Sequence, residues 1–302
     1  MAGSWLPGIV GCTASGKTDL ALALGRSRRL EVISADSRQI YRGMDIGTAK
    51  PTAEEMRRLP HHLVDVADPD EYYSAGRFAR EALRAAEEIR ERGAQPLVVG
   101  GTGLYMIALS GGLDDMPARN DRIRKGLRAA EEERPGTLRR MLLRLDSKRA
   151  MELGEADTVR HVRALEIVLQ SGKRFTRLRG SARGPSADLR LAGLRVRLPV
   201  LRRRIAARAR RMIDSGLADE VKALLGRGYG RDSALGRTIG YTEMLDVLDG
   251  LLDMEEAAER IEANTWKLAR RQRNMFGRLS GVRWFSPSCA EAVESYLFSR
   301  GR

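Results

Sequence analysis

The chain has 302 residues, of which 42% are apolar and 31% charged, and its formal net charge at pH 7 is +14. This length allows one large core, or one core with a smaller appended domain, and the composition is typical of a globular protein. Because no run of eighteen apolar residues occurs and no basic segment precedes an apolar one at the N-terminus, we expect no membrane span and no secretory signal. Two cysteines without metal-type spacing, Cys12 and Cys289, favour the reducing cytoplasm over a disulfide-rich compartment.

The first predicted elements are a short buried strand over residues 6–10, a glycine-rich loop, and a helix from residue 19 onward. The loop fits the pattern G-x-x-x-x-G-K-[ST], and its residues are Gly11, Cys12, Thr13, Ala14, Ser15, Gly16, Lys17 and Thr18. In the order strand, loop and helix, the backbone N–H groups and the positive end of the helix bind a di- or triphosphate. Lys17 adds a positive charge and Thr18 offers a hydroxyl to Mg²⁺. The alternative is a glycine-rich turn without a ligand.

Strand-like and helix-like segments continue to alternate over the first hundred residues. Apolar runs at residues 30–34, 62–66 and 96–99 predict three further strands, and residues 74–92 predict an amphipathic helix. This alternation predicts an α/β fold, a parallel sheet flanked by helices on both faces. Ligands of such sheets bind beyond the carboxyl ends of the strands, where each run here ends in polar or glycine residues.

Two of these strand ends carry candidate catalytic residues. Asp36 follows the second strand, where it can accept a proton from a nucleophile or hold magnesium, unless it only caps the next helix. The fourth strand ends in Gly100-Gly101-Thr102-Gly103, whose glycines allow a backbone to approach a ligand closely. We expect Thr102 to project into the crevice; a tight turn before a helix is the alternative.

The character of the sequence changes between residues 116 and 188, where charged helical patterns replace the strand-like runs. We predict an all-helical domain inserted there, with residues 1–115 and 189–302 forming the catalytic core. A strand at residues 189–196 returns the chain to the sheet, and helices, a closing strand at 282–285 and a terminal helix follow. Eight arginines and no acidic residue occur from Arg195 to Arg211, a cluster that favours a polyanionic partner such as nucleic acid; for each single arginine a solvated helix face is the alternative.

Eight sequence blocks occur in the order seen in bacterial tRNA dimethylallyltransferases: GCTASGKT, ADSRQIYRGMDIGTAKP, HHLVDV, YSAGRFAR, VVGGTGLY, RALEIVLQSGK, IGYTEM and RRQRNMF. The chain resembles this family of tRNA isopentenyltransferases from about residue 7 to residue 285. The resemblance implies transfer of the dimethylallyl group of dimethylallyl diphosphate to the exocyclic amine of the adenine 3′ to the anticodon, with release of pyrophosphate. It implies a cytoplasmic enzyme whose partner is the anticodon stem-loop of tRNA.

The same resemblance assigns roles to individual residues. In this family the loop binds a pyrophosphate group, Asp36 acts as the general base, Thr102 contacts the diphosphate, and Lys17 with Thr18-bound Mg²⁺ stabilises the leaving group. The target adenine has to be extruded from its stack before it can react. The positions matching tRNA contacts of the family are Asp36, Ser37, Arg38, Gln39, Thr102, Arg124, Val159, Arg160, His161, Val162, Arg163, Arg237, Thr238, Ile239, Gly240, Tyr241 and Thr242.

One departure from the family concerns the diphosphate. Leu198 stands where relatives usually carry an arginine that reaches it, so we take the neighbouring Arg197 as the candidate. Three other functions stay open: an isopentenyltransferase acting on free adenine nucleotides, a phosphate-loop kinase of a small molecule, and a tRNA-binding protein without activity. We expect a monomer without an obligate protein partner.

Overall fold

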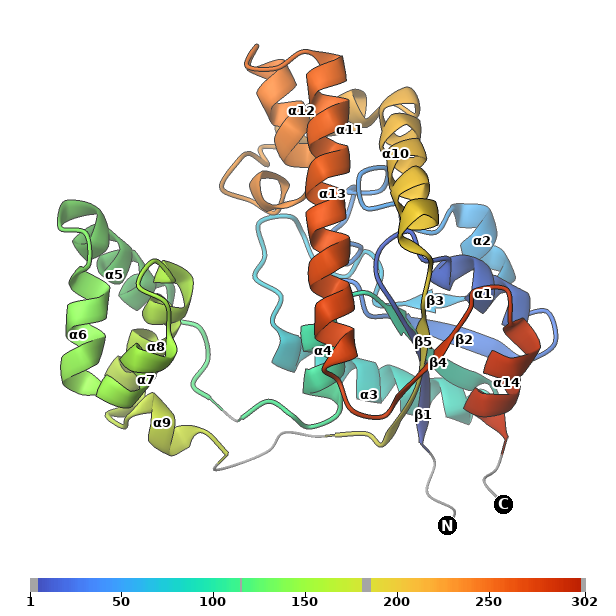
Figure 1. Ribbon diagram of the computed structural model, residues 1–302, viewed down its shortest axis with the longest axis horizontal. Coiled ribbons are helices and arrows are strands. Elements are labelled where there is room, and N and C mark those ends of the chain that lie inside the picture. Colours follow the sequence, from blue (N-terminus) through green and yellow to red (C-terminus); the bar gives the residue numbers. More distant parts are fainter. Residues whose placement is uncertain (1–4, 115, 181–185, 300–302) are drawn as a thin grey trace. The chain divides into compact units, whose positions relative to one another are not determined.

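The computed structural model describes residues 5–114, 116–180 and 186–299 (Figure 1). It consists of two compact units, residues 1–110 with 185–302 and residues 111–184. The first unit contains a six-stranded sheet flanked by helices, whereas the described residues of the second unit form helices only. In the ranges described, no helix has the length and apolar character needed to cross a membrane.

The sheet of the first unit is parallel throughout, with the strand order β3-β2-β4-β1-β5-β6. Its strands are β1 (Leu6–Val10), β2 (Leu30–Ser34), β3 (His61–His62), β4 (Gln95–Gly100), β5 (Leu189–Leu194) and β6 (Val282–Phe285). Val10 at the end of β1 pairs with Gly100 of β4 and Gly193 of β5, so the carboxyl ends of these strands lie at one edge. The predicted α/β fold is confirmed.

One predicted strand is much shorter than expected. The apolar run at residues 62–66 suggested five strand residues, but β3 ends at His62. Leu63 and Asp65 have φ angles of 61° and 56°, in the left-handed region that breaks an extended chain. Apolar character alone did not reveal this turn.

Helices cover both faces of the sheet because its side chains alternate between two hydrophobic clusters. Val98 of β4 points to the cluster under α3 (Ala75–Glu91) and α4 (Gly103–Leu109). Leu97 and Val99 point to the cluster under α1 (Lys17–Leu24) and α14 (Ala290–Phe298). Both flanking layers therefore follow from one alternating apolar run.

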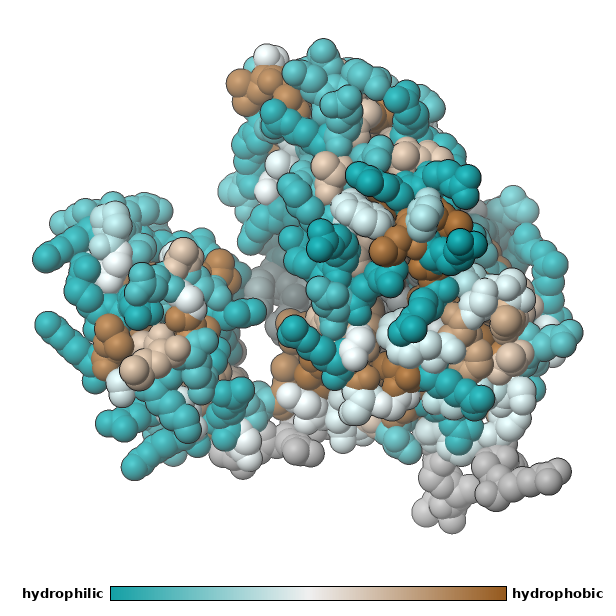
Figure 2. Space-filling view, in the orientation of Figure 1, coloured by the Kyte–Doolittle hydropathy of each residue, from teal (hydrophilic) through white to brown (hydrophobic). Residues whose placement is uncertain are grey.

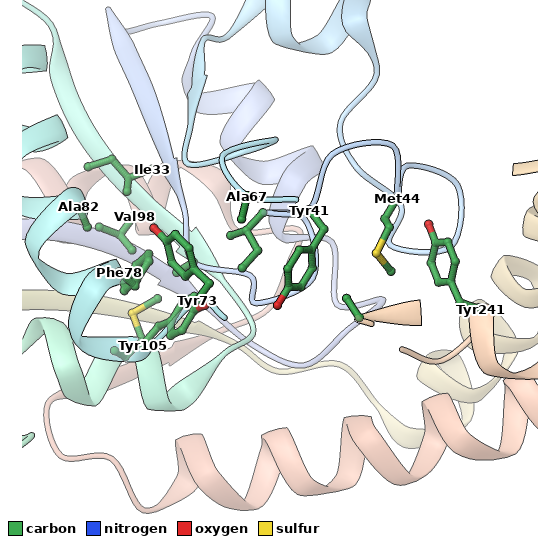
Figure 3. Close-up of a cluster of buried hydrophobic side chains, with 14 of the residues drawn as sticks. Ile33, Tyr41, Met44, Ala67, Tyr73, Phe78, Ala82, Val98, Tyr105 and Tyr241 are labelled. Carbon is green, nitrogen blue, oxygen red and sulfur yellow. The ribbon is translucent and has the colours of Figure 1, made fainter. Parts of the chain in front are cut away.

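Figure 3 shows part of the first cluster, where aromatic rings fill the space between α3, α4 and the sheet. The rings of Phe78 and Tyr105 stack with centroids 4.1 Å apart, and Ala82 lies beside them on α3. Burial of two large rings stabilises the fold by roughly 1.5–3 kcal/mol for each ring. This packing fixes α4, which begins directly after the glycine turn at the end of β4.

The remaining helices of the first unit follow β5 or precede β3. They are α2 (Ala53–Arg58), α10 (Leu198–Asp214), α11 (Leu217–Gly226), the short 3₁₀ helix η1 (Leu235–Arg237), α12 (Tyr241–Leu248) and α13 (Met254–Gly277). Near both boundaries with the second unit, the N–H of Ala187 donates a 2.8 Å hydrogen bond to the carbonyl of Leu109. The chain segments that lead into and out of the second unit are thus joined by a backbone hydrogen bond.

The second unit contains α5 (Asp121–Glu133), α6 (Thr137–Leu145), α7 (Ser147–Glu152), α8 (Thr158–Ser171) and α9 (Phe175–Leu178). Leu127, Leu138, Leu142 and Leu165 are among the buried side chains that form its own core. The helices α5, α7 and α8 start at side-chain caps; Asn120, for example, accepts a hydrogen bond from the N–H of Ile123. The described part of this segment therefore packs as a separate helical body.

Candidate active site

The phosphate loop, residues 11–18, connects β1 to α1 in the order that the sequence predicted. The Lys17 ammonium donates hydrogen bonds to the carbonyls of Gly11 (3.0 Å) and Cys12 (2.9 Å). Burial lowers the pKa of Lys17 to about 8, although the nearby Cys12 and Asp36 act in the opposite direction. A half-buried ammonium at the end of a sheet is a strong site for an anion, which would replace the solvation that the side chain has lost.

A cavity of about 960 Å³ opens beside this loop, at the carboxyl ends of the strands. Most of the phosphate loop lines it, together with the glycines that end β4. Side chains from the segment after β2, from α10 and from α13 complete the wall. The charged and amide side chains among the lining residues are Lys17, Asp19, Asp36, Gln39, Asp45, Lys50, Glu55, Asp65, Arg204, Arg208, Arg211 and Gln272, and the hydroxyl-bearing ones are Thr13, Ser15, Thr18, Thr52 and Ser215. The phosphate loop, five carboxylate side chains including that of Asp36, and three arginines therefore line one cavity.

Asp36 follows β2 in a tight turn and lines this cavity. Its Oδ1 accepts a 2.9 Å hydrogen bond from the N–H of Arg38, which fixes the carboxylate. The electrostatic effect of Asp36 on both Lys17 and Arg208 indicates that its charge lies near both cations. The structure thus brings the predicted carboxylate and the predicted lysine to one site.

Thr102 forms hydrogen bonds with the turn that carries Asp36. Its Oγ1 accepts a 3.0 Å hydrogen bond from the N–H of Ser37, and its own N–H donates to the carbonyl of Ala35. The adjacent Gly100 permits this approach, because a Cβ there would lie 2.1 Å from the Ala35 oxygen. Thr102 is half-buried and is not among the residues lining the cavity. Its contact with a diphosphate stays a prediction.

Arginines of α10 supply the remaining charge of the cavity wall. Arg204, Arg208 and Arg211 are spaced four and three residues apart, which places them on one face of the helix. The half-buried Arg208 donates to the carbonyl of Thr48 (3.2 Å), and burial of its guanidinium lowers the pKa of Arg208 while Asp36 raises it. Helical spacing within the basic run was the signal that could have identified Arg208.

The structure does not bring Arg197 to the cavity. Arg197 is the exposed N-cap residue of α10 and is not among the lining residues. It precedes Arg208 by eleven residues, or about 16 Å along a helix axis. The cation facing Asp36 and Lys17 in this structure is Arg208.

Glu220 of α11 binds the backbone of the segment that follows Asp36. The Glu220 carboxylate accepts hydrogen bonds from the N–H groups of Asp45 (3.1 Å) and Ile46 (2.8 Å) and from the hydroxyl of Tyr241 (2.5 Å). Gly47 is required beneath this ring, because a Cβ there would lie 2.3 Å from it. Glu220 was not identified from the sequence, since its partners are remote along the chain.

The predicted tRNA-contacting positions differ in how accessible their side chains are. Tyr241, Thr238, His161 and Val162 are buried, and Gly240 has no side chain, so any contact with a partner would use backbone atoms or need a rearrangement. Others have exposed or half-buried side chains: Ser37, Arg38, Gln39, Val159, Arg160, Arg237, Ile239 and Thr242. Their binding roles stay predictions.

In the second unit, two predicted contacts, Arg124 and Arg163, share one buried acid. The Glu166 side chain, which is 0% exposed, accepts hydrogen bonds from Arg124 (2.7 and 2.8 Å), Arg163 (2.6 Å) and the N–H of Asn120 (2.7 Å). Burial alone would raise the pKa of Glu166, but these hydrogen bonds outweigh it and lower the pKa to about 2. Glu166 therefore fixes both guanidinium groups, a role that the sequence did not indicate.

We expect Glu166→Gln to destabilise the second unit by about 3–5 kcal/mol at pH 7, because it leaves two guanidinium groups near an uncharged amide. The pKa of Glu166 is lower in the folded than in the unfolded chain, so its stabilising effect is complete above about pH 4.5 and is lost as the pH falls towards 2. The difference in stability between Glu166→Gln and wild type should therefore decrease as the pH falls. Hydrogen exchange of α5 and α8 at several pH values measures this stability difference. A difference that is independent of pH would contradict the stabilising role of the ionised Glu166.

Comparison with known proteins places the chain in a family. The family model for IPP transferase matches residues 39–279, and that for isopentenyl transferase matches residues 6–67. The tRNA dimethylallyltransferase of Thermotoga petrophila is 44% identical over 91% of this chain and 90% of its own length. tRNA dimethylallyltransferase 1 of Syntrophotalea carbinolica is 43% identical over 96% and 95%.

Two solved structures are similar over nearly all of this chain. The tRNA isopentenylpyrophosphate transferase of Bacillus halodurans has a TM-score of 0.69 at 39% identity and covers 96% of this chain and 93% of its own. A eukaryotic dimethylallyltransferase acting on tRNA has a TM-score of 0.78 at 25% identity and covers 96% and 76%. With this fold, this cavity and these sequence matches, the chain belongs to the IPP transferase family.

Proposed function

We propose that this protein transfers the dimethylallyl group of dimethylallyl diphosphate to the exocyclic amine of the adenine 3′ to the anticodon of tRNA in the cytoplasm. The observation that carries the proposal is the shared cavity, which is lined by a phosphate loop with a half-buried lysine and by the fixed carboxylate of Asp36. The relatives named above are tRNA dimethylallyltransferases and tRNA isopentenyltransferases, which supports the choice of donor and acceptor.

The donor end of the cavity is formed by the phosphate loop and α10. Lys17 and Arg208 would bind the two phosphate groups, assisted by the N–H groups of the loop. When the C–O bond of the donor breaks, its electron pair stays on the departing pyrophosphate, and these positive groups stabilise the charge that develops there. Because the allylic carbon tolerates a partly cationic transition state, we expect this stabilisation to be the larger catalytic contribution.

The acceptor end is formed by the turn after β2. As the exocyclic nitrogen bonds to the allylic carbon, it has to lose a proton, and Asp36 is the carboxylate positioned to accept it. An aromatic amine is a weak nucleophile, so the hydrogen bond that fixes Asp36 also contributes by orienting the two reactants. The adenine has to leave its stack to reach this turn.

The cavity also fits Mg²⁺ bound together with the substrate. In the described ranges, no group of three or more His, Cys, Asp or Glu side chains is arranged to hold a metal ion, so these residues alone provide no closed site. The Thr18 hydroxyl lines the cavity next to Lys17, and Mg²⁺ is commonly held by one such group, phosphate oxygens and water. Bound there, the ion would neutralise part of the diphosphate charge.

The tRNA backbone would be bound by basic side chains on the surface. Arg202 and Arg203 of α10 lie outside the cavity and are exposed, and hydrophilic side chains dominate the face of each unit seen in Figure 2. Contacts of this kind position a nucleic acid without reading its sequence. Their number determines how steeply binding depends on salt.

The test is incubation of the protein with Mg²⁺, dimethylallyl diphosphate and unmodified tRNA. We expect release of pyrophosphate and, by mass spectrometry, one added five-carbon unit on the adenine 3′ to the anticodon. Equal activity on free AMP would instead indicate a nucleotide isopentenyltransferase, and turnover of ATP without pyrophosphate release from the prenyl donor would indicate a kinase. tRNA binding without turnover would contradict the proposed reaction.

The affinity for tRNA should fall with salt by roughly 0.7–0.9 log units per log unit of salt for each phosphate neutralised. Arg160→Ala removes a guanidinium that is 69% exposed on α8, so it should weaken binding and reduce the slope by about 1. Lys173→Ala, which removes another exposed charge of this unit, serves as the comparison. Binding titrations from 50 to 300 mM salt measure both slopes, and an unchanged slope for Arg160→Ala would exclude a phosphate contact there.

A further inference from the structure

The side chain of Gln272, on the last turns of α13, connects two backbone segments of the cavity wall. Its Oε1 accepts a 2.8 Å hydrogen bond from the N–H of Thr13 in the phosphate loop. Its Nε2 donates a 2.9 Å hydrogen bond to the carbonyl of Gly101, in the turn after β4. Gln272 also lines the cavity itself.

These two segments come from neighbouring strands that stop pairing just before the site. The β1–β4 register ends at Val10 and Gly100, beyond which the phosphate loop and the glycine turn separate to form the cavity. Gln272 restores a connection between them after the backbone pairing has ended. It also engages the Thr13 N–H, which is therefore directed at the amide oxygen of Gln272 in this structure.

A primary amide meets both requirements at once, because it offers one acceptor and two donors on a single planar group. A glutamate at position 272 would accept from Thr13 but would place a second acceptor against the Gly101 carbonyl. A methionine has similar length but forms neither strong hydrogen bond. The contact of Gln272 with Gly101 is close, since a Cβ on Gly101 would lie 2.7 Å from Nε2.

Neighbouring residues of α13 fix the helix where Gln272 needs it. Met275 packs against Gly103 at the start of α4, and Arg273 donates to the carbonyl of Val196, two residues after the end of β5 (3.3 Å). Ala269 is fully buried in the cluster that includes Cys12 of the phosphate loop. Figure 1 shows α13 running from α12 down to α4. Gln272 is therefore held on a rigid element and can transmit that rigidity to both loops.

We propose that Gln272 is a positioning residue, which sets the distance between the phosphate loop and the turn carrying Thr102 and thereby the alignment of donor and acceptor. This inference rests on the proposed function, because the two segments hold the diphosphate and the Asp36 turn respectively. A misplacement of about 1 Å can lower the rate of an aligned reaction by about 100-fold without abolishing binding. Gln272 should accordingly affect kcat more than KM.

The test compares Gln272→Met and Gln272→Glu with Asn274→Ala, an exposed control two residues away on α13. Gln272→Met should lower kcat for prenyl transfer by about 10- to 100-fold and change the KM for dimethylallyl diphosphate by less than about threefold. Gln272→Glu should lower kcat by a similar factor and also raise this KM, because its carboxylate repels the diphosphate. Asn274→Ala should match wild type. A raised KM with unchanged kcat, or unchanged kinetics in both variants, would overturn the proposal.

Hydrogen exchange separates failure of this inference from failure of the proposed function. Peptides covering residues 11–18 and 100–105 should exchange faster in both Gln272 variants than in wild type, whatever reaction the protein catalyses. If wild type transfers no prenyl group to tRNA, the proposed function and the catalytic part of this inference both fail. If wild type is active but exchange is unchanged in both variants, Gln272 does not connect the loops and this inference alone is wrong.

Discussion

Replacement of Asp36 by Asn is expected to lower kcat for prenyl transfer to tRNA by about 10²- to 10⁴-fold, the usual effect of removing a general base. An amide has the same shape as the carboxylate, and its oxygen can still accept the 2.9 Å hydrogen bond from the N–H of Arg38, so the turn should persist. What is lost is the ability to take a proton from the amine. Single-turnover measurements with saturating tRNA report this step directly.

The binding constants should separate this role from a structural one. The affinities of Asp36→Asn for tRNA and for dimethylallyl diphosphate should stay within about threefold of wild type, since the substitution removes no phosphate contact. Asp70→Asn, at an exposed loop residue, is the matched control for loss of a negative charge. Turnover of Asp36→Asn close to that of wild type would show that the proton leaves by another route.

Replacement of Arg208 by Ala is expected to lower kcat by about 10²- to 10³-fold, as is typical when one group that stabilises a developing anion is removed. The guanidinium lines the cavity near Lys17 and Asp36 and is held by the carbonyl of Thr48. Arg208→Lys should recover only part of the loss, because an ammonium lacks the planar arrangement of donors that binds two phosphate oxygens. Steady-state kinetics with varied dimethylallyl diphosphate measure both variants.

Two other arginines serve as comparisons for Arg208. Arg210 lies on the same helix but outside the cavity, where it pairs with Glu255 (2.9 Å), so Arg210→Ala should have kcat close to wild type. Arg197→Ala tests the assignment made from the sequence. Impaired catalysis in Arg197→Ala together with normal catalysis in Arg208→Ala would show that Arg197 reaches the diphosphate after all.

Local sequence patterns predicted those parts of the site that depend on consecutive residues. The phosphate loop was identified because strand, glycines, lysine and helix follow one another within about twenty residues. Asp36 was identified because polar residues directly after a buried strand point to the ligand edge of a parallel sheet. The β3 strand was overestimated, since an apolar run does not show that Leu63 and Asp65 adopt left-handed backbone angles.

The parts that were missed depend on contacts between remote segments. Gln272 binds the phosphate loop across a separation of 259 residues, and Glu220 binds Ile46 across 174 residues. Glu166 could be placed beneath Arg124 only once α5 and α8 were seen to pack together. Arg208 was hidden for a different reason: eight arginines lie close together in the sequence, and only the helix face distinguishes those lining the cavity.

The hydrogen bond between Ala187 and Leu109 has a consequence for how this architecture can vary. Because the first unit holds both of these residues close together, the residues between them form a closed loop with fixed ends. The entropy of closing a loop rises only slowly with its length, by about 0.6 kcal/mol for each doubling. The segment between these two residues can therefore be lengthened, shortened or exchanged with little loss of stability in the first unit. Leu109 and Ala187 are accordingly suitable positions at which to insert another domain.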